Sequence, residues 1–226
     1  IEESLDLAGV QIEAEDAVLR AYERDGFPVT VVRPSHTYDD LKPPLPGDWT
    51  VIDRICRGDE VVVPGDGTSL WTLTHSADFA QGLVGLLGNP LTLGETFHIT
   101  SDEVYPWDQI YEIIAAAAGV EARLVHLPSE FFGLAAPEWF WSELIMGDLR
   151  YSAVFDNSKI RRYVPSYAPR VTLAEVAPRM LRWRAAHPDA TRPDPAADAV
   201  LDRLVRGYHG ARKFFADLAP VGDLSA

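Results

Sequence analysis

A run of four β-branched residues, Val29 to Val32, constrains the fold of this chain more than any other stretch. The helix-patterned segment from Gln11 to Asp25 precedes the run, and the turn-forming pair Arg33-Pro34 follows it. A short apolar run bounded in this way predicts a buried strand of a parallel sheet. Ligands of open α/β sheets bind outside the carboxyl ends of strands. The residues Ser35 to Tyr38, which come next, are therefore the first candidates for a site.

Composition bounds the class of protein. The 226 residues suffice for one domain, or for one domain with a small lobe, and 47% hydrophobic with 24% charged residues is typical of a soluble globular protein. The net charge of −14 disfavours nucleic acid or an anionic membrane as a partner, because phosphate binding needs a basic surface. No apolar run approaches the roughly 18–20 residues that span a bilayer.

The single cysteine, Cys56, excludes an intramolecular disulfide and is compatible with a reducing, cytoplasmic location. No Cys/His set has the spacing of metal ligands, so we expect no metal site. The chain opens at Ile1 within what resembles an αβ unit. We therefore expect residues before Ile1 to be missing.

Helices and strands alternate along the chain, which predicts the α/β class with only about two long strands in a main sheet. We place Rossmann-like elements, interleaved with a lobe, in residues 1–100, most of the lobe in 101–190, and a linker and helix in 191–226. Besides the first helix and strand, the expected helices are 48–57, 76–87, 106–118, 158–163, one opening at 172, and 196–218, and the expected strands are 60–63, 70–74, 95–100, 123–127 and 153–156.

Five local features give more specific expectations. Asp48 can cap its helix, and Gly65-Asp66-Gly67 predicts a hairpin turn. Thr172 to Glu175 matches a capping box, and Pro178 predicts a kink or restart in the helix that follows. The aromatic-rich segment from Ser129 to Met146 fits a helical lid or subdomain core, with a ligand cage as the alternative.

The order of motifs resembles a known family. The motifs are Gly26 to Pro34, Gly65 to Thr68, His75 to Ala80, Glu95 to Thr100 and Val154 to Ile160. They resemble the extended short-chain dehydrogenases/reductases, and more narrowly the NAD-dependent epimerase/dehydratase group. The resemblance covers about residues 11–208 and matches the C-terminal half of such proteins. It implies the C-terminal part of a Rossmann-like doubly wound fold plus a small mixed α/β substrate-binding lobe.

The glycine-rich phosphate-binding turn of the family is absent from the sequence. The resemblance implies a Tyr-x-x-x-Lys pair, in which the tyrosine is the general acid/base and the lysine lowers its pKa. Leu7 and Gln11 occupy these positions, and neither can perform that chemistry. Catalytic residues therefore stay unassigned. Either the matching segment is missing or rearranged, or the protein is catalytically degenerate.

The same resemblance assigns site residues. It places Pro34 and Ser35 next to the nicotinamide, and His36, Thr37 and Trp71 on the substrate side. For His36 an equally weighted alternative is that it is a loop histidine whose side chain is hydrogen-bonded to the backbone. We expect His75 to be structural near a helix start, His98 to be core, and Asp156 to Lys159 to signal a helix start.

Arginines that grip a nucleotide diphosphate in the family also lack counterparts. Leu70-Trp71 stands at one position and Leu144 to Met146 at the other. Two phosphate charges would have no cationic partner there, which argues against a nucleotide-diphosphate sugar as substrate.

The resemblance implies an NAD(P)-dependent epimerase, dehydratase or reductase, and thus an isomerase or an oxidoreductase. The substrate would be a sugar-like or keto/hydroxy small molecule. This chain would lack the cofactor-binding N-terminal half, so we expect NAD or NADP to bind the intact protein rather than this chain alone. The alternative is a degenerate relative that serves as a binding or scaffold protein. An isolated chain of this kind would leave its main strand uncovered, and we expect it to pair with another chain, for instance as a homo-oligomer, or to aggregate.

Overall fold

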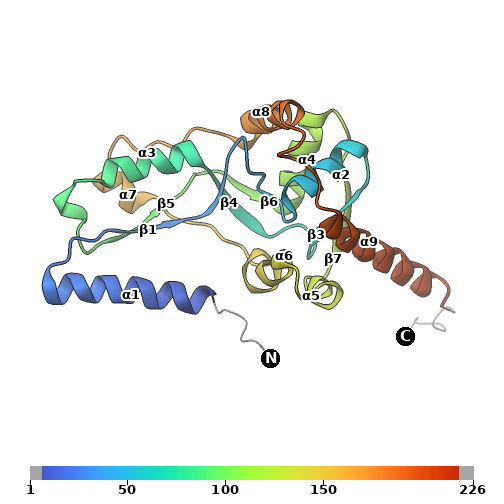
Figure 1. Cartoon of the computed structure of the whole chain (residues 1–226), viewed down its shortest axis with the longest axis horizontal. Coiled ribbons are helices and arrows are strands. Elements are labelled where there is room, and N and C mark those ends of the chain that lie inside the picture. The colour runs from blue at the N-terminus through green and yellow to red at the C-terminus, as the bar shows by residue number, and fades with distance from the viewer. Residues whose placement is uncertain (1–6, 219–226) are drawn as a thin grey trace, which may run out of the picture. The chain divides into compact units, whose positions relative to one another are not determined.

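The computed structural model describes residues 7–218 and shows an α/β protein, as the sequence predicts (Figure 1). The chain divides into two compact units, which are described here one at a time. The first unit comprises Ile1–Thr37, Thr72–Glu103 and Val154–Val171, and the second comprises Tyr38–Trp71, Val104–Ala153 and Thr172–Ala226. Of the described helices, none is long and apolar enough to cross a membrane.

The first unit is built on a parallel pair of strands. Strands β1 and β5 pair in register from Val31 with Thr96 to Pro34 with Ile99. Helices α1 and α3 run on opposite sides of this pair (Figure 1). The elements of the unit are α1 (Leu7–Asp25), β1 (Val31–Pro34), α3 (Ser76–Leu86), the 3-10 turn η1 (Pro90–Thr92), β5 (Thr96–Ile99) and α7 (Ser158–Tyr163).

The core of the first unit lies between β5, α3 and α7. Its buried members are Leu86, Phe97, Ile99, Ile160, Val164 and Tyr167. Gly82 on α3 permits this packing, because a Cβ there would lie 2.5 Å from Cγ2 of Ile99. The glycine therefore brings the helix backbone close to the strand.

The second unit contains a second parallel pair, β3 with β7, in register from Glu60 with Arg123 to Pro64 with Leu127. Helices α2, α4 and α9 pack against β3, and α8 packs against α4. The elements are α2 (Asp48–Arg57), β3 (Glu60–Pro64), β6 (Val104–Pro106), α4 (Trp107–Ala118), β7 (Arg123–Leu127), α5 (Glu130–Ala135), α6 (Phe140–Leu144), the π-helical turn η2 (Ile145–Leu149), α8 (Leu173–Ala186) and α9 (Pro195–Ala216).

Three short strands form a separate sheet in the order β2 (His36–Tyr38), β4 (Leu70–His75) and β6. The unit boundaries fall within β2 and within β4. These two strands therefore carry the chain from one unit into the other.

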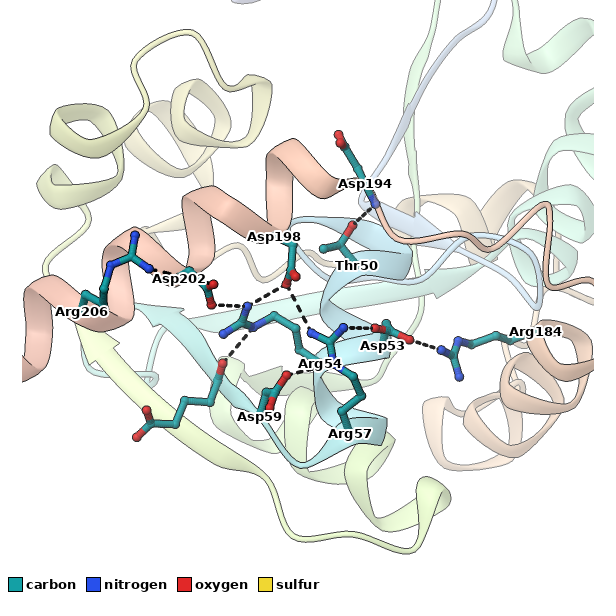
Figure 2. Close-up of polar contacts among 11 residues, drawn as sticks. Thr50, Asp53, Arg54, Arg57, Asp59, Arg184, Asp194, Asp198, Asp202 and Arg206 are labelled. Atoms are coloured by element: carbon teal, nitrogen blue, oxygen red, sulfur yellow. Dashed lines mark hydrogen bonds and ion pairs between the residues drawn. The ribbon is translucent and has the colours of Figure 1, made fainter.

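Buried charge fixes the start of α9 in the second unit (Figure 2). The side chain of Arg54 is 5% exposed and contacts Asp198 at 2.7 Å and Asp202 at 2.8 Å, while its Nε donates to the carbonyl of Glu60. The backbone N–H of Asp194 donates to the hydroxyl of Thr50. Burial alone would lower the pKa of Arg54, but the hydrogen bonds with the two aspartates raise it, so the guanidinium stays charged.

Several expectations about the opening strand need correction. The strand begins at Val31 rather than Val29, because the carbonyl of Val29 accepts from the N–H of Gly94, one residue out of the register in which Val31 pairs with Thr96. Only Val31 is buried, and Arg33 and Pro34 are exposed. Residues 36–38, for which the sequence predicted no strand, form the short strand β2.

The hairpin expected at Gly65 to Gly67 is also wrong. Strand β3 pairs with β7 rather than with β4, and the turn continues this pairing through the N–H of Gly65, which donates to the carbonyl of Leu127. Gly67 has φ +77°, and a Cβ on it would lie 1.9 Å from a carboxylate oxygen of Asp108. Packing against α4, rather than hairpin formation, therefore requires this glycine.

Three smaller corrections concern helix and strand ends. Gly47 is the N-cap of α2, so Asp48 begins the helix without capping it. Residues 153–156 form an isolated bridge at Ala153 in place of a strand. The helix α8 opens with the expected capping box at Thr172 and continues through Pro178 to Ala186, so the helix does not restart at the proline.

Candidate functional site

The site is organised by the opposite directions of α1 and β1 in the first unit. The helix leads into the strand through residues 26–30, so the start of the helix lies beside the carboxyl end of the strand. Gln11 and Pro34 consequently line one open cavity of about 650 Å³. Its other lining residues are Ile12, Ala14, Glu15, Val32, Arg33 and His98.

An ion pair lines this cavity. Glu15 on α1 accepts from Nε of Arg33 on β1 at 2.9 Å. This hydrogen bond lowers the pKa of Glu15 and raises that of Arg33. His98 lies near the pair, and burial, together with the charge of Arg33, lowers its pKa, which favours the neutral imidazole. His98 is half-buried rather than core, and its ring packs against Phe155.

The carboxyl ends of β1 and β5 are joined by hydroxyl groups. The hydroxyls of Ser35 and Thr74 lie 2.6 Å apart, and the N–H of Ser101 donates to the same Thr74 oxygen at 2.8 Å. Thr74 therefore links the residue that follows β1 to the segment that follows β5. We call Ser35, Thr74 and Ser101, of which Ser101 contributes its backbone N–H, the hydroxyl cluster.

Asn157 anchors the neighbouring segment. Its amide group donates to the carbonyl of Thr100 at 2.7 Å and to that of Ser101 at 3.2 Å, while its oxygen accepts from the Thr100 hydroxyl at 3.0 Å. Asn157 is 3% exposed. The predicted helix start at residues 156–159 is confirmed by α7. The sequence did not predict that Asn157 anchors Thr100 and Ser101, because no local pattern indicates that Asn157 lies beside the end of β5.

The predicted site residues of the first unit gather at this end of the sheet. Pro34 and Thr37 are exposed, and Ser35 and His36 are half-buried. His75 caps α3 through Nδ1, which accepts from the N–H of Ala77, so its expected structural role is confirmed.

Trp71 belongs to the second unit. It is 4% exposed, its Nε1 donates to the carbonyl of Leu149 at 3.1 Å, and its ring packs against Trp107. The polar atom of this indole already has a partner within the protein. Its assignment to the substrate stays a prediction.

The chemistry of the cluster is that of neutral hydroxyls and amides, which orient polar ligands but do not transfer protons at neutral pH. Tyr167 lies nearby, yet its hydroxyl donates to the carbonyl of Thr100, and burial raises its pKa above the ordinary phenol value. It is therefore no substitute for a catalytic phenol. Gln11 is described, whereas the side chain of Leu7 lies outside the described residues.

A dinucleotide does not fit the described residues on their own. Phosphates are held by backbone N–H groups of a glycine-rich turn that opens a helix. The turn at Gly65 to Gly67 leads into β4 instead, and its Asp66 carboxylate has a lowered pKa because Thr68 hydrogen-bonds it. The ionised carboxylate of Asp66 repels phosphate. Within residues 7–218, no group of three His, Cys, Asp or Glu residues could hold a metal ion.

The chain is similar to known proteins both in sequence and in fold. None of the protein-family models matches the chain. The chain is 30% identical over 166 residues to the 2'-dehydrokanamycin reductase of Streptomyces kanamyceticus, an alignment that spans 72% of this chain and 46% of that protein. It is 30% identical over 104 residues to a chloroplast stem-loop binding protein of 41 kDa from Arabidopsis thaliana, spanning 45% of this chain and 27% of that protein.

A solved structure of UDP-glucuronic acid 4-epimerase from Bacillus cereus in complex with NAD has the same fold, with a TM-score of 0.60 and 17% sequence identity. The match covers 82% of this chain and 52% of the epimerase chain. Other structures of this fold are likewise epimerases and dehydratases. The resemblance to the extended short-chain dehydrogenase/reductase fold is thus confirmed. The chain spans less than half the length of the curated relatives and about half of the solved structures it matches.

Proposed function

We propose that this chain is the substrate-side part of an NAD(P)-dependent oxidoreductase that acts on a sugar-like carbonyl or hydroxyl compound. One observation carries the proposal. The carboxyl ends of β1 and β5 meet at the hydroxyl cluster, and the adjoining cavity is lined by Gln11 and Pro34. Open α/β sheets bind ligands at this edge.

The substrate class that fits best is an oxidised amino sugar. The reductase relative is named for 2'-dehydrokanamycin, which combines a ketone with protonatable amines. A net charge of −14 attracts such a cation. The absence of arginine from Leu70-Trp71 points the same way.

Each residue at the edge has a proposed role. Pro34 and Ser35 lie on the cofactor side, and His36 and Thr37 face the substrate, whose hydroxyls they would hydrogen-bond. The hydroxyl cluster positions Ser35, because Thr74 holds it against the segment after β5. The phosphate-binding turn would come from sequence outside these residues, whereas the positions of the catalytic Tyr and Lys are held in this chain by Leu7 and Gln11.

Calorimetric titration tests substrate binding by the chain as it stands. We expect 2'-dehydrokanamycin to bind and UDP-glucose not to bind. Thr37→Ala should weaken binding about 10-fold through the loss of a hydrogen bond. Thr68→Ala, at an exposed threonine of the second unit, is the matched control and should leave binding unchanged. Binding of UDP-glucose in preference, or no binding of either compound, would contradict the substrate assignment.

A fusion tests the redox chemistry. The cofactor-binding part of the Streptomyces reductase would be joined to this chain carrying Leu7→Tyr and Gln11→Lys, with the native Leu7 and Gln11 fusion as the control. We expect NADPH consumption with 2'-dehydrokanamycin only in the restored fusion. Substrate binding without consumption in the restored fusion would overturn the oxidoreductase assignment and favour a binding protein.

A further inference from the structure

A cavity of about 170 Å³ lies in the second unit, where three helices begin. Its walls come from the start of α2, the start of α6 and the segment that leads into α9, all of which belong to this unit. The N–H of Asp194 donates to the hydroxyl of Thr50 and so holds the start of α9 against α2 (Figure 2). A single water needs only about 10–15 Å³, so the cavity has room for a small organic molecule.

Three tryptophans line this cavity, Trp49 from α2 and Trp139 and Trp141 from the start of α6. The ring of Trp49 is held by stacking on Trp183, with 5.6 Å between the ring centroids, and Trp141 is only 9% exposed. Half of the six tryptophans of the chain therefore gather at one cavity. Two of them come from the aromatic-rich segment for which the sequence left a ligand cage as the alternative.

The carboxylate of Asp48 also lines the cavity. Its Oδ1 is buried and has no hydrogen-bond partner among the residues that the structure describes. Burial raises the pKa of Asp48, and the charge of Lys42 offsets only part of this effect. Asp48 is also the one non-glycine residue of the described chain with a positive φ, +49°, a backbone conformation that costs free energy. Its negative charge is thus partly withdrawn from water without full compensation by the protein.

Two other charged residues line the cavity, and each has a partner. Asp194 accepts from the N–H of Ala196 and so caps α9. Arg192 contacts Asp189 at 2.7 Å, and its side chain is 74% exposed, so water screens its charge. The positive ends of α2 and α9 attract anions, and the carboxylates of Asp48 and Asp194 already supply them. Two carboxylates against one screened guanidinium favour a cation in the cavity.

We propose that this cavity binds a small organic cation that carries a methylated, quaternary ammonium group. Aromatic ring faces attract cations, and tryptophan does so most strongly. A quaternary ammonium has no N–H to satisfy, so the charge of Asp48 attracts it although Oδ1 is buried. A primary ammonium has three N–H donors to satisfy, and indole rings offer no acceptor. This inference goes beyond the proposed function, which uses none of these residues.

NMR of the tryptophan indole N–H groups in the 226-residue chain, titrated with choline chloride, tests the proposal. We expect saturable binding with a Kd below about 10 mM and shifts at Trp49, Trp139 and Trp141. The signals of Trp71 and Trp107, whose indoles donate to the carbonyl of Leu149, should stay in place. Neohexanol, the uncharged isostere in which carbon replaces the nitrogen of choline, should bind at least about 10-fold more weakly. Ethanolamine, which carries a primary ammonium, should also bind more weakly than choline.

Two variants remove one negative charge each. Asp48→Asn keeps a residue type that tolerates positive φ and should weaken choline binding about 5-fold or more. Glu138→Gln is the matched control, because Glu138 is exposed next to Trp139 but does not line the cavity, and it should leave the affinity unchanged. If Asp48→Asn does not fold, Trp139→Leu should weaken choline binding about 3-fold and leave neohexanol binding unchanged.

Titration without saturation, or equal shifts of all six tryptophans, would overturn the proposal. So would equal affinities for choline and either comparison ligand, or an unchanged affinity in Asp48→Asn. Phosphatidylcholine vesicles carry the same cation on a lipid, and we expect them not to sediment the chain. If vesicles bind through Asp48 while free choline does not bind, the assignment to a free small cation is wrong.

Discussion

The molecule contains two parallel strand pairs that differ in how they are enclosed. In the second unit, β3 is buried from Val61 to Pro64, with helices α2, α4 and α9 packed against it. In the first unit, β1 is buried only at Val31 and borders two cavities. Both strands are short, rich in valine and parallel to their partners, so composition does not explain the contrast.

The contrast shows that two strands of similar composition can differ widely in how far other segments bury them. Helices cover both faces of parallel sheets in complete α/β domains. The β3 pair has this cover within its own unit, whereas β1 borders two cavities. The proposed site belongs to the less enclosed pair.

The largest expected effect is a buried charge in the enclosed pair. Val61→Asp places a carboxylate at a 0% exposed position and should lower the free energy of unfolding by about 4 kcal/mol or more. Val32→Asp, at the half-buried position of β1, should cost about 1 kcal/mol in the monomer. Urea denaturation measures both. Equal losses would show that the two pairs are enclosed alike.

The next effect concerns the charge that secures α9 over the enclosed pair. Arg54→Ala leaves Asp198 and Asp202 without their buried partner and should cost about 3 kcal/mol, with faster hydrogen exchange in α9. Arg57→Ala is the control, because Arg57 also contacts Asp198 but its side chain is 43% exposed, and it should cost less than about 1 kcal/mol. If α9 exchange is unchanged in Arg54→Ala, this ion pair does not hold the helix.

Within the open unit, Asn157 provides a smaller test. Asn157→Ala removes the bonds to Thr100 and Ser101 and should cost about 2 kcal/mol. Asn89→Ala, which removes only the cap of η1, should cost about 1 kcal/mol or less. Chemical shifts of the hydroxyl cluster should move in the first variant only. Unmoved shifts would mean that Asn157 does not position the cluster.

The smallest effect is a pH dependence from the cavity beside β1. The pKa of His98 is lowered from 6.5 by burial and by Arg33, with Glu15 and Phe155 as its other neighbours. The unfolded chain therefore takes up this proton first, and stability falls as the pH drops below 6.5. His98→Gln should flatten the stability profile from 6.5 down to the folded pKa, as thermal unfolding would measure. An unchanged profile would show that His98 is solvated in the folded protein.

Glu15 acts in the same direction at lower pH. Arg33 holds its pKa below 4.5, so its contribution is present above that pH and is lost as the pH falls further. Glu15→Gln, measured beside His98→Gln, separates the two contributions by their pH ranges.

Local signals in the sequence located most elements. The strand Arg123–Leu127 and the helix Ser158–Tyr163 have the predicted bounds. The capping box at Thr172 was equally readable. These features depend on residues that are neighbours along the chain, so the sequence alone specifies them.

The candidate site was only partly readable. The position of Ser35 to Thr37 after a strand indicated the edge of the sheet, but Thr74, Ser101 and Asn157 gave no such signal. They come from three separate segments that meet only because β1 and β5 pair in parallel. The hairpin error has the same origin, since a glycine turn does not show which strand will pair with the one before it.

Local signals along the chain specify the α/β class and the order of helices and strands, because periodicity, capping and turn chemistry act over a few residues. The tertiary structure sets which parallel pair is enclosed and which polar groups meet at the strand ends. Those outcomes depend on contacts between distant segments, and a run of valines reads the same whether helices cover it or a cavity lies beside it.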